Sequence, residues 1–297
     1  MTQLDTPIQA SFIGLGAMGG PMAATLARSG HLAGAWNRSS GRAEAWGRTH
    51  GTRVFATLAE VACAAPVVFL CVSRDADVLE LVGSLLPHLV PGQIVIDCST
   101  TAPQTARTAA LRLRSAGVAF LDCPVSGGTE GAAAGTLTLF VGGDPATVER
   151  VRPLLASLGS RITHLGPTGQ GQAAKAVNQL MLAGINQAVS EALAFAVAEK
   201  LPLPELIDAL SHGAAASWFL AHRGPRMAER HYPLGFKMAL HAKDLRICRD
   251  MAAQHGVQLP LAEMTLHHYD RLPGCAEQDL AALFELKRAL FEKKSTG

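Results

Sequence analysis

A glycine-rich turn between a short apolar run and an alanine-rich segment constrains this chain more than any other feature. The run Gln9–Ile13 leads into Gly14-Leu15-Gly16-Ala17-Met18-Gly19, and a helical pattern follows from Gly19 to Arg28. In a strand–turn–helix unit of this kind the first glycine allows the tight turn, the second lets a pyrophosphate approach the backbone, and the third packs the helix against the strand. Residues 14–19 are therefore predicted to bind a dinucleotide at the helix start. The alternative is a glycine-rich loop without a ligand.

The residues after the next predicted strand bear on which dinucleotide binds. The strand Leu32–Trp36 is followed by Asn37-Arg38-Ser39, where an NAD site usually has an acid that accepts from the ribose 2′-hydroxyl. Here the first residue is neutral and the second carries a guanidinium fork that suits a phosphate. We predict NADPH over NADH, with Arg38 and Ser39, and Asn37 as a further candidate, on the 2′-phosphate. The alternative is that Arg38 is a solvated loop cation.

Length, charge and cysteine usage narrow the class of protein. The 297 residues allow one large domain or two ordinary ones. The 26 basic and 24 acidic side chains nearly cancel, which argues against electrostatic binding of nucleic acid or of a membrane. The six cysteines show no Cys-x-x-Cys spacing, which is typical of reduced thiols in a cytoplasmic protein, and the scattered histidines indicate no metal site.

The first 165 residues alternate short apolar runs with helical stretches, which predicts a Rossmann-type, doubly wound and largely parallel α/β sheet. The predicted strands are Gln9–Ile13, Leu32–Trp36, Val67–Val72, Ile94–Asp97, Val118–Leu121, Thr136–Val141 and Arg161–Leu165. The predicted helices are Gly19–Arg28, Arg42–His50, Thr57–Ala64, Asp75–Leu86, Pro103–Ser115 and Pro145–Leu158. Because ligands of this fold lie at the carboxyl ends of the strands, five segments are expected to converge: residues 14–19, 37–39, Cys71-Val72-Ser73, 99–101 and 122–128.

The pattern changes after residue 169. From Gln170 onward no segment reads as a strand, and Ala, Leu and Met recur at helical spacing as far as Phe291. We predict a dinucleotide-binding domain over 1–165 and an all-helical domain over 166–297 for substrate binding and oligomerisation. The second domain opens with a long inter-domain helix of about thirty residues, which spans ~45 Å.

This long helix is apolar on more than one side and so needs cover. Asn186, Gln187, Ser190 and Glu191 fall within its most apolar part, which favours a buried helix of a soluble protein over a membrane span. A second subunit is expected to cover part of the helix. We therefore predict a homodimer or homotetramer.

Two polar segments at strand ends are candidates for substrate and cofactor contact. Ser99-Thr100-Thr101 offers hydroxyls near a cofactor ribose and nicotinamide, with Thr100 the favoured contact; the alternative, compatible with it, is an N-cap for the next helix. Ser126-Gly127-Gly128 offers a hydroxyl beside consecutive backbone N–H groups, which can form a nest for a carboxylate. The alternative for this second segment is a plain turn.

Lys175 is the candidate general acid/base. It lies three residues before Asn178, so both side chains share a face in the first turns of an otherwise apolar helix. A partly desolvated ammonium there would have its pKa lowered toward ~7–8, and Asn178 would orient it or the substrate oxygen. Gly169 and Gly171 are expected to keep the helix start slim so that a ligand can approach. The alternative is a lysine that reaches solvent along the helix.

Several of these motifs together resemble one family over Ala10 to about Leu283. The chain resembles the β-hydroxyacid dehydrogenases, the group of 3-hydroxyisobutyrate dehydrogenase, tartronate semialdehyde reductase and glyoxylate/succinic semialdehyde reductase. The shared motifs, in family order, are residues 14–22, Asp97-Cys98-Ser99-Thr100, Asp122-Cys123-Pro124-Val125-Ser126-Gly127-Gly128, Gly142-Gly143, Lys175-Ala176-Val177-Asn178 and Lys243-Asp244.

The resemblance implies a role for each matched position. Lys175 looks like the catalytic lysine and Asn178 like the substrate-orienting asparagine. Residues 126–128 look like the substrate-carboxylate loop, and Thr100 lies where the family touches nicotinamide and substrate. Lys243 looks like a cofactor contact supplied by the helical domain, with Asp244 and Phe236 lining the same cleft. The chain departs from many members at Gln179, where they have a second asparagine, and this difference bears on the substrate.

These observations predict an NADP(H)-dependent dehydrogenase or reductase that transfers hydride between NADPH and a small semialdehyde or 3-hydroxy acid, with Lys175 as general acid/base. NAD is the less favoured cofactor. An imine or other carbonyl reductase of the same fold would not depend on Ser126. A non-catalytic NADP-binding module is the alternative from another class, although such a module would more often have lost Lys175.

Overall fold

The computed structural model describes residues 8–292, so the outermost residues of both predicted domains, 1–7 and 293–297, lie outside the described range. The chain forms two compact units, the first ending at Lys175 and the second beginning at Ala176. Compared with the expected boundary after residue 165, this division assigns the first turns of the long helix to the first unit. Each unit is described by itself.

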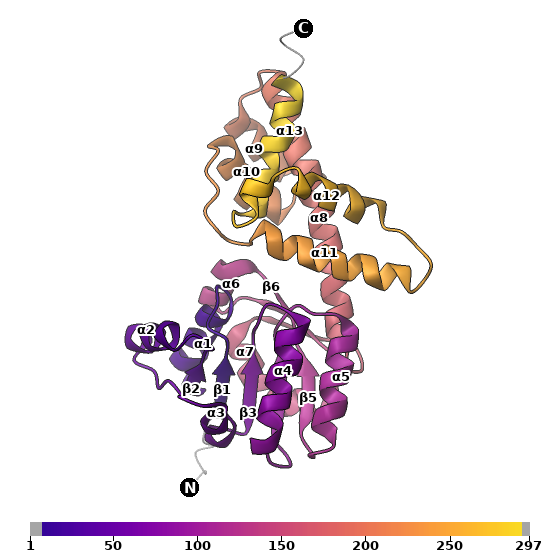
Figure 1. Cartoon of the computed structure of the whole chain (residues 1–297). Helices are drawn as coiled ribbons and strands as arrows, with labels where there is room; N and C mark the ends of the chain where they lie inside the picture. Colours follow the sequence, from indigo (N-terminus) through magenta and orange to yellow (C-terminus); the bar gives the residue numbers. More distant parts are fainter. Residues whose placement is uncertain (1–7, 293–297) are drawn as a thin grey trace. The chain divides into compact units, whose positions relative to one another are not determined.

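The first unit is built on a five-stranded parallel sheet in the order β2-β1-β3-β4-β5 (Figure 1). The strand bounds are β1 (Ala10–Ile13), β2 (Leu32–Trp36), β3 (Val67–Leu70), β4 (Ile94–Asp97) and β5 (Ala119–Asp122). The helices around it are α1 (Gly19–Arg28), α2 (Ser40–His50), α3 (Leu58–Ala64), α4 (Asp75–Leu85), α5 (Pro103–Arg114) and α7 (Pro145–Leu158). The Rossmann-type prediction is confirmed.

Both faces of this sheet are buried, as strands that are apolar on both sides require. Phe12 and Ile96 belong to the core that includes Met22 of α1 and the apolar residues of α7. Ile13 and Val95 point the other way, into the core formed with α3, α4 and α5. Because the carboxyl ends of the parallel strands all meet one edge, the loops after β1 to β5 are gathered there.

The prediction of a single sheet is wrong for the last strands. A separate three-stranded sheet contains β6 (Val125–Ser126), β7 (Thr138–Val141) and β8 (Arg161–His164). β6 runs antiparallel to β7, and one isolated bridge between Asp122 and Gly142 links β7 to the end of β5. The chain returns through a short helix, α6 (Gly128–Ala134), instead of a full crossover helix, so β7 reverses direction. Apolar alternation alone does not specify that reversal.

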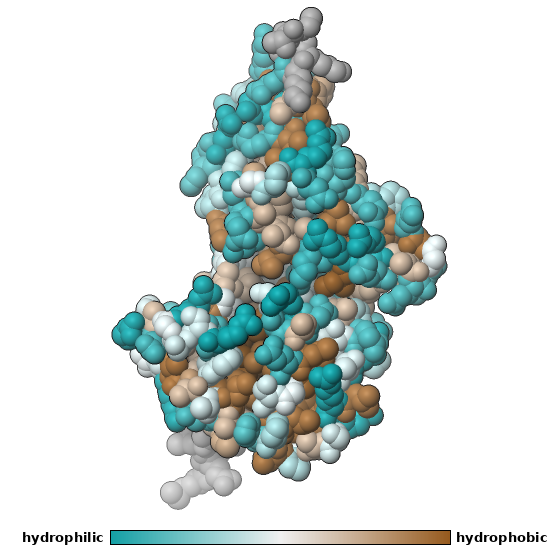
Figure 2. Space-filling model, in the orientation of Figure 1, coloured by the Kyte–Doolittle hydropathy of each residue, from teal (hydrophilic) through white to brown (hydrophobic). Residues whose placement is uncertain are grey.

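The second unit is helical throughout its described residues, 176–292, as predicted. Its helices are the later part of α8 (Gln170–Ala198), followed by α9 (Leu203–Ser211), α10 (Trp218–Ala228), α11 (Met238–Ala253), α12 (Pro260–Asp270) and α13 (Leu283–Glu292). Two cores lie along α8, one around Leu245 and Leu283 and the other around Leu193 and Phe284. On the face drawn in Figure 2, hydrophobic and hydrophilic residues are interspersed.

Helix α8 has 29 residues and combines buried polar groups with an exposed apolar stripe. Asn186, fully buried, donates to the Leu280 carbonyl at 2.9 Å and accepts from the Ser190 hydroxyl at 3.1 Å, so its amide is satisfied inside the core. Val177 and Met181 lie outside the core, 60 % and 63 % exposed. By length and composition α8 could cross a membrane, and 44 % of its most apolar stretch is buried.

Candidate active site

The glycine turn after β1 has the backbone geometry that its sequence requires. Gly14 has φ of 98°, and a Cβ there would lie 2.2 Å from the Cys71 carbonyl oxygen. A Cβ on Gly19 would lie 1.9 Å from the Gly14 carbonyl oxygen, so α1 can start this close to β1 only with glycine. At Gly16 a Cβ would meet nothing within 4 Å. Gly14 and Gly19 are thus required by packing, whereas the space beside Gly16 is open.

The start of α1 suits an anionic group. The first turn of α1 contains no acidic residue, and no side chain caps its N-terminus. The helix dipole and the N–H groups of that turn therefore face outward without a competing carboxylate. Together with the open space at Gly16, this arrangement fits the pyrophosphate of a dinucleotide held by residues 14–19.

Asn37, at the end of β2, supports the glycine turn. Its Oδ1 accepts from the Leu15 backbone N–H at 3.0 Å, and its Nδ2 donates to the Ser39 carbonyl at 3.3 Å. The side-chain amide therefore links the end of β2 to the turn after β1. The Gly14 N–H is bonded to the Trp36 carbonyl and the Leu15 N–H to Asn37, so a ligand would have to use the N–H groups that follow Leu15 in the turn.

Arg38 extends from the same loop, and its side chain is 76 % exposed. Its Nη1 lies 3.5 Å from Asp77 Oδ1, a long contact, while Arg74 forms two shorter hydrogen bonds of 3.0 and 3.1 Å to the same carboxylate. These hydrogen bonds from Arg74, together with the charges of both arginines, lower the pKa of Asp77. Ser39 stands at the N-terminus of α2 and its hydroxyl does not cap that helix. Arg74 was not singled out by sequence, and its only signal was its place directly after Ser73.

The loops after β3 and β4 are tied to each other. The Val72 N–H donates to the Ser99 hydroxyl at 2.9 Å, and the Ser99 N–H donates to Asp97 Oδ1 at 2.9 Å. The Ser99 hydroxyl therefore positions the 71–73 loop. Helix α5 begins with Ala102 as its N-cap, so the interpretation of Ser99 and its neighbours as an N-cap is wrong. Burial and the nearby Asp97 charge raise the pKa of the Cys71 thiol to about 12.

Two fully buried carboxyl groups lie side by side at the ends of β4 and β5. Asp97 and Asp122 are register partners across the two strands, and neither is exposed to solvent. Burial raises the pKa of Asp97 to about 7, partly offset by its hydrogen bonds to Ser99. Burial also raises the pKa of Asp122, against backbone hydrogen bonds from Gly169 and Gln172 that favour its charged form. Sequence analysis placed both residues in motifs but gave neither carboxylate a role.

The Asp122 carboxylate holds the start of α8. Its Oδ1 accepts from the Gly169 N–H at 2.8 Å and its Oδ2 from the Gln172 N–H at 2.9 Å. A Cβ on Gly171 would lie 2.5 Å from the Phe140 carbonyl oxygen, so this glycine is required by contact with β7. The expectation that Gly171 makes room for a ligand is wrong, because the protein backbone fills that space.

Lys175 lies in the second turn of α8 and is only 7 % exposed. A lysine this buried is uncommon, because its ammonium loses hydration. Thr100, three residues after Asp97, is half-buried in the loop that follows β4. Both residues thus belong to the first unit and to the segments gathered at the carboxyl ends of its strands.

The Ser126–Gly128 segment turns sharply into α6. Gly127 and Gly128 have φ of 136° and 66°, values that favour glycine, and α6 begins at Gly128. The half-buried Ser126 precedes this turn. Glu130, in the first turn of α6, accepts from the Thr129 hydroxyl at 3.1 Å and is exposed. Backbone N–H groups are thus presented at a helix start, beside one solvated carboxylate that the sequence analysis did not consider.

In the second unit, Asn178 and Asp244 are joined through Gln179. Asn178 Nδ2 donates to Gln179 Oε1 at 2.8 Å, and Gln179 Nε2 donates to Asp244 Oδ2 at 2.6 Å. Lys243 Nζ lies 3.0 Å from the other oxygen of that carboxylate. Three predicted site residues thus form one polar chain across α8 and α11. Gln179 joins Asn178 to Asp244, because its side chain is one methylene longer than that of asparagine and reaches both.

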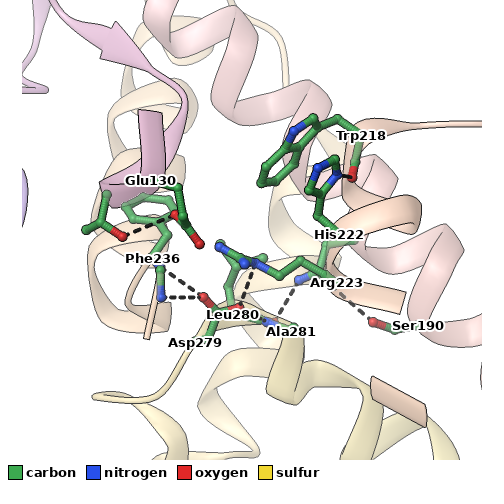
Figure 3. Close-up of polar contacts among 12 residues, drawn as sticks. Glu130, Ser190, Trp218, His222, Arg223, Phe236, Asp279, Leu280 and Ala281 are labelled. Carbon is green, nitrogen blue, oxygen red and sulfur yellow. Dashed lines mark hydrogen bonds and ion pairs between the residues drawn. The ribbon is translucent and has the colours of Figure 1, made fainter. Parts of the chain in front are cut away.

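Phe236 is held by a buried carboxylate that the sequence analysis did not identify. Asp279 Oδ2 accepts from the N–H groups of Gly235 and Phe236, each at 2.9 Å, and Arg223 Nε lies 3.6 Å from its Oδ1 (Figure 3). Trp218, 53 % exposed, stacks on His222 with ring centroids 4.2 Å apart. The described residues contain no group of three or more His, Cys, Asp or Glu placed to hold a metal ion.

Comparison with known proteins gives the family. A family model described as the NAD binding domain of 6-phosphogluconate dehydrogenase matches residues 9–166, and one described as the NAD-binding of NADP-dependent 3-hydroxyisobutyrate dehydrogenase matches residues 169–286. The chain belongs to the β-hydroxyacid dehydrogenase family. It is thus a hydroxyacid dehydrogenase-type oxidoreductase with a pyridine-nucleotide-binding domain.

Individual members of the β-hydroxyacid dehydrogenase family are similar over most of the chain. The NAD-dependent L-serine dehydrogenase of Pseudomonas aeruginosa is 36 % identical over 290 residues, 94 % of this chain and 97 % of that protein. The 2-hydroxy-3-oxopropionate reductase of Escherichia coli is 37 % identical over 252 residues, 84 % and 86 % of the two chains. The solved structure of Mycobacterium tuberculosis 3-hydroxyisobutyrate dehydrogenase with L-serine has a TM-score of 0.86 at 32 % identity, covering 95 % of this chain and 99 % of that chain.

The buried Asp97 gives a pH-dependent test of this site. Because its folded-state pKa of about 7 is above the unfolded value of 3.8, the folded protein binds more protons between those pH values, and the free energy of unfolding falls as pH rises through that window. Asp97→Asn keeps an oxygen for the Ser99 N–H and removes the titration. We expect the stability of Asp97→Asn relative to the natural protein to rise from pH 4 to 7 by a few kcal/mol, at about 1.4 kcal/mol per pH unit.

Urea unfolding followed by circular dichroism at several pH values checks this expectation. The exposed Asp250→Asn variant is the matched control, and its stability difference from the natural protein should not vary in that window. A difference for Asp97→Asn that is equally independent of pH would contradict the assignment.

Proposed function

We propose that this protein is an NADP(H)-dependent 3-hydroxyacid dehydrogenase or semialdehyde reductase, with Lys175 as its general acid/base. The observation that carries the proposal is the buried lysine, 7 % exposed, in the second turn of a helix fixed to the strand ends. An ammonium in such a place is costly unless it interacts with polar or anionic groups. The oxygen of a reacting carbonyl or alcohol is a group of that kind.

Different residues of the chain have different roles in the proposed hydride transfer. A bound nicotinamide supplies or accepts the hydride. Lys175 donates a proton or hydrogen bond to the carbonyl oxygen as negative charge develops there, and takes the proton back in the oxidising direction. Ser126, Gly127 and Gly128 hold the substrate carboxylate, which fixes the reacting carbon at a constant distance. Asn178, held by Gln179, orients the substrate oxygen.

Cofactor contacts are proposed for the loops at the strand ends. Residues 14–19 hold the pyrophosphate, and the Cys71–Ser73 loop and Thr100 contact the ribose and nicotinamide. Lys243 is proposed as a further cofactor contact, and Asp244 and Phe236 as substrate contacts. NADP(H) is preferred because Arg38 is exposed, makes only a long contact to Asp77, and is joined by no acid in the first turn of α2.

Loss of the Lys175 ammonium tests the mechanism. We expect Lys175→Met to lower kcat about 10²–10⁴-fold, the usual range for an acid–base group, with little change in NADPH affinity. Turnover is measured as NADPH oxidation with glyoxylate, succinic semialdehyde, tartronate semialdehyde and methylmalonate semialdehyde, and affinity by fluorescence titration. The exposed Lys200→Met is the control and should keep full activity. A loss below about tenfold in Lys175→Met, with cofactor bound, would contradict this mechanism.

The same assay, extended to hydroxy acids and cyclic imines, separates the alternatives. An imine reductase of this fold would turn over cyclic imines and would be insensitive to Ser126→Ala. A binding module would bind NADPH and oxidise it with none of the acids, aldehydes or imines.

Replacement of Arg38 tests the choice of cofactor. Arg38→Asp should repel the 2′-phosphate and accept from the ribose hydroxyl of NADH, so the ratio of kcat/KM for NADPH to that for NADH should fall about 10- to 100-fold, the range expected for a hydrogen bond to a charged group. Arg48→Asp, exposed in the last turn of α2, is the charge-matched control. An unchanged ratio in Arg38→Asp would show that this guanidinium does not bind the phosphate.

We also propose that the protein is a homo-oligomer in which a second copy covers the apolar stripe of α8. The exposed residues Val177, Met181, Ala188 and Phe195 are spaced by four, seven and seven positions, which puts them on one side of the helix. Large contiguous apolar faces of this kind are characteristic of subunit contacts. The expected state is a dimer or tetramer.

Light scattering after size exclusion checks this proposal. We expect the natural protein to have at least twice the chain mass, and Met181→Glu to lower that mass because a charge would be buried in the contact. Val257→Glu replaces an equally exposed apolar residue outside the stripe and should leave the mass unchanged. A monomeric natural protein, or an unchanged mass for Met181→Glu, would contradict the proposal.

A further inference from the structure

Gln172, the third residue of α8, has a side chain that is almost completely buried, at 1 % exposure. Its Oε1 accepts from the Thr101 N–H at 3.1 Å, and its Nε2 donates to the Ser99 carbonyl at 2.8 Å. Both bonds go to backbone groups on either side of Thr100. The amide therefore pairs with the backbone of this segment as a neighbouring strand would.

The backbone of Gln172 is fixed as firmly as its side chain. Its N–H donates to Asp122 at 2.9 Å, which joins this turn of α8 to the end of β5. Gly142 and Gly171 allow close contact here, since a Cβ on Gly142 would lie 2.6 Å from the Asp122 carboxylate and 2.8 Å from the Gly171 nitrogen. Gln172 thus links two strand ends: β5 through its backbone and the loop after β4 through its side chain.

The loop after β4 is held from its other side as well. Ser99 donates its N–H to Asp97 and accepts from the Val72 N–H, each at 2.9 Å. Residues 99–101 are therefore fixed between the strand ends and α8. The two bonds to Gln172 join this segment to α8.

Lys175 follows Gln172 by one helical turn. Residues three apart on a helix are neighbours on its surface, with roughly 5–6 Å between their Cβ atoms. Any shift of the 99–101 segment against this turn would change the spacing between Thr100 and Lys175. Catalytic groups that are misplaced by about 1 Å can lose on the order of 10²-fold in rate.

We propose that Gln172 is a positioning residue for the reaction: its two hydrogen bonds to the backbone around Thr100 set the position of that segment relative to Lys175. This inference rests on the proposed function for the roles of Thr100 and Lys175. The bonds require one donor and one acceptor at fixed places, which a primary amide of this length supplies at every pH. Methionine fills a similar volume but leaves both buried backbone groups unpaired, and ionised glutamate faces the Ser99 carbonyl with an acceptor.

Two variants and one control test the inference. Gln172→Met should lower kcat about 10- to 100-fold with NADPH affinity changed by less than about threefold, because the cofactor contacts remain while the spacing is lost. Gln172→Glu should be impaired at high pH and should recover as pH falls, since the protonated carboxyl donates to the Ser99 carbonyl again. Gln104→Met, exposed on α5, should match the natural protein in every measurement.

A readout without turnover keeps this test separate from the test of the function. Amide hydrogen exchange of Thr101 should become at least about tenfold faster in Gln172→Met, because its N–H loses its acceptor. Unchanged exchange, or a kcat within twofold of the natural protein, would overturn the inference. If Lys175→Met remains active while the Thr101 exchange rate rises in Gln172→Met, the proposed role of Lys175 fails, although Gln172 does hold the 99–101 segment. If Lys175→Met is inactive and Gln172→Met is fully active, the proposed function stands and the positioning role of Gln172 fails.

Discussion

The contact on which the candidate site depends is that between the Asp122 carboxylate and the first turn of α8. One buried side chain accepts from the N–H groups of Gly169 and Gln172, and so satisfies two donors that a helix start leaves unpaired. The same bonds fix the helix that carries Lys175 to the end of β5. A carboxylate at a helix N-terminus is also favoured by the helix dipole. The lysine proposed for chemistry therefore stands on a helix whose start is set by a charge in the sheet.

Burying carboxyl groups at the strand ends costs free energy, and two such groups, Asp97 and Asp122, lie there. Asp97 and Asp122 are adjacent and both fully buried, which explains why the pKa of each is raised. Two like charges this close disfavour full ionisation of the pair. Asp122 accepts from the N–H groups of Gly169 and Gln172, and these bonds favour its charged form, whereas Asp97 accepts chiefly from Ser99.

Much of the fold follows from local sequence. The glycine turn, the apolar strands and the starts of α1, α5 and α7 were predictable because each depends on residues within one or two turns. The family and the fold class were predicted from motifs of the same local kind, and both predictions were confirmed. The reversal of β7 was not predictable, because it depends on pairing between Asp122 and Gly142, twenty residues apart. The purpose of Gly171 was misjudged, since its contact with Phe140 exists only once α8 has docked.

In the candidate site, too, local motifs were predictable from sequence and long-range contacts were not. Sequence motifs singled out Lys175, Asn178 and Asp244, whose residue types and spacing carry chemical meaning. The residues that support the site, Gln172 and Gln179, are ordinary amides whose roles arise from partners far away in the chain, at Thr101 and Asp244. No local pattern distinguishes such a glutamine from a solvated one. The structure therefore identifies the supporting residues, whereas the sequence motifs identify those proposed to react.

The most direct measurement of the central claim is a crystal structure of the complex with NADP(H) and a small hydroxy acid. The account predicts that Lys175 Nζ lies about 2.6–3.2 Å from the hydroxyl oxygen of the substrate, the range of a direct hydrogen bond. An Nζ that points into bulk solvent, with another side chain bonded to that oxygen, would contradict the account.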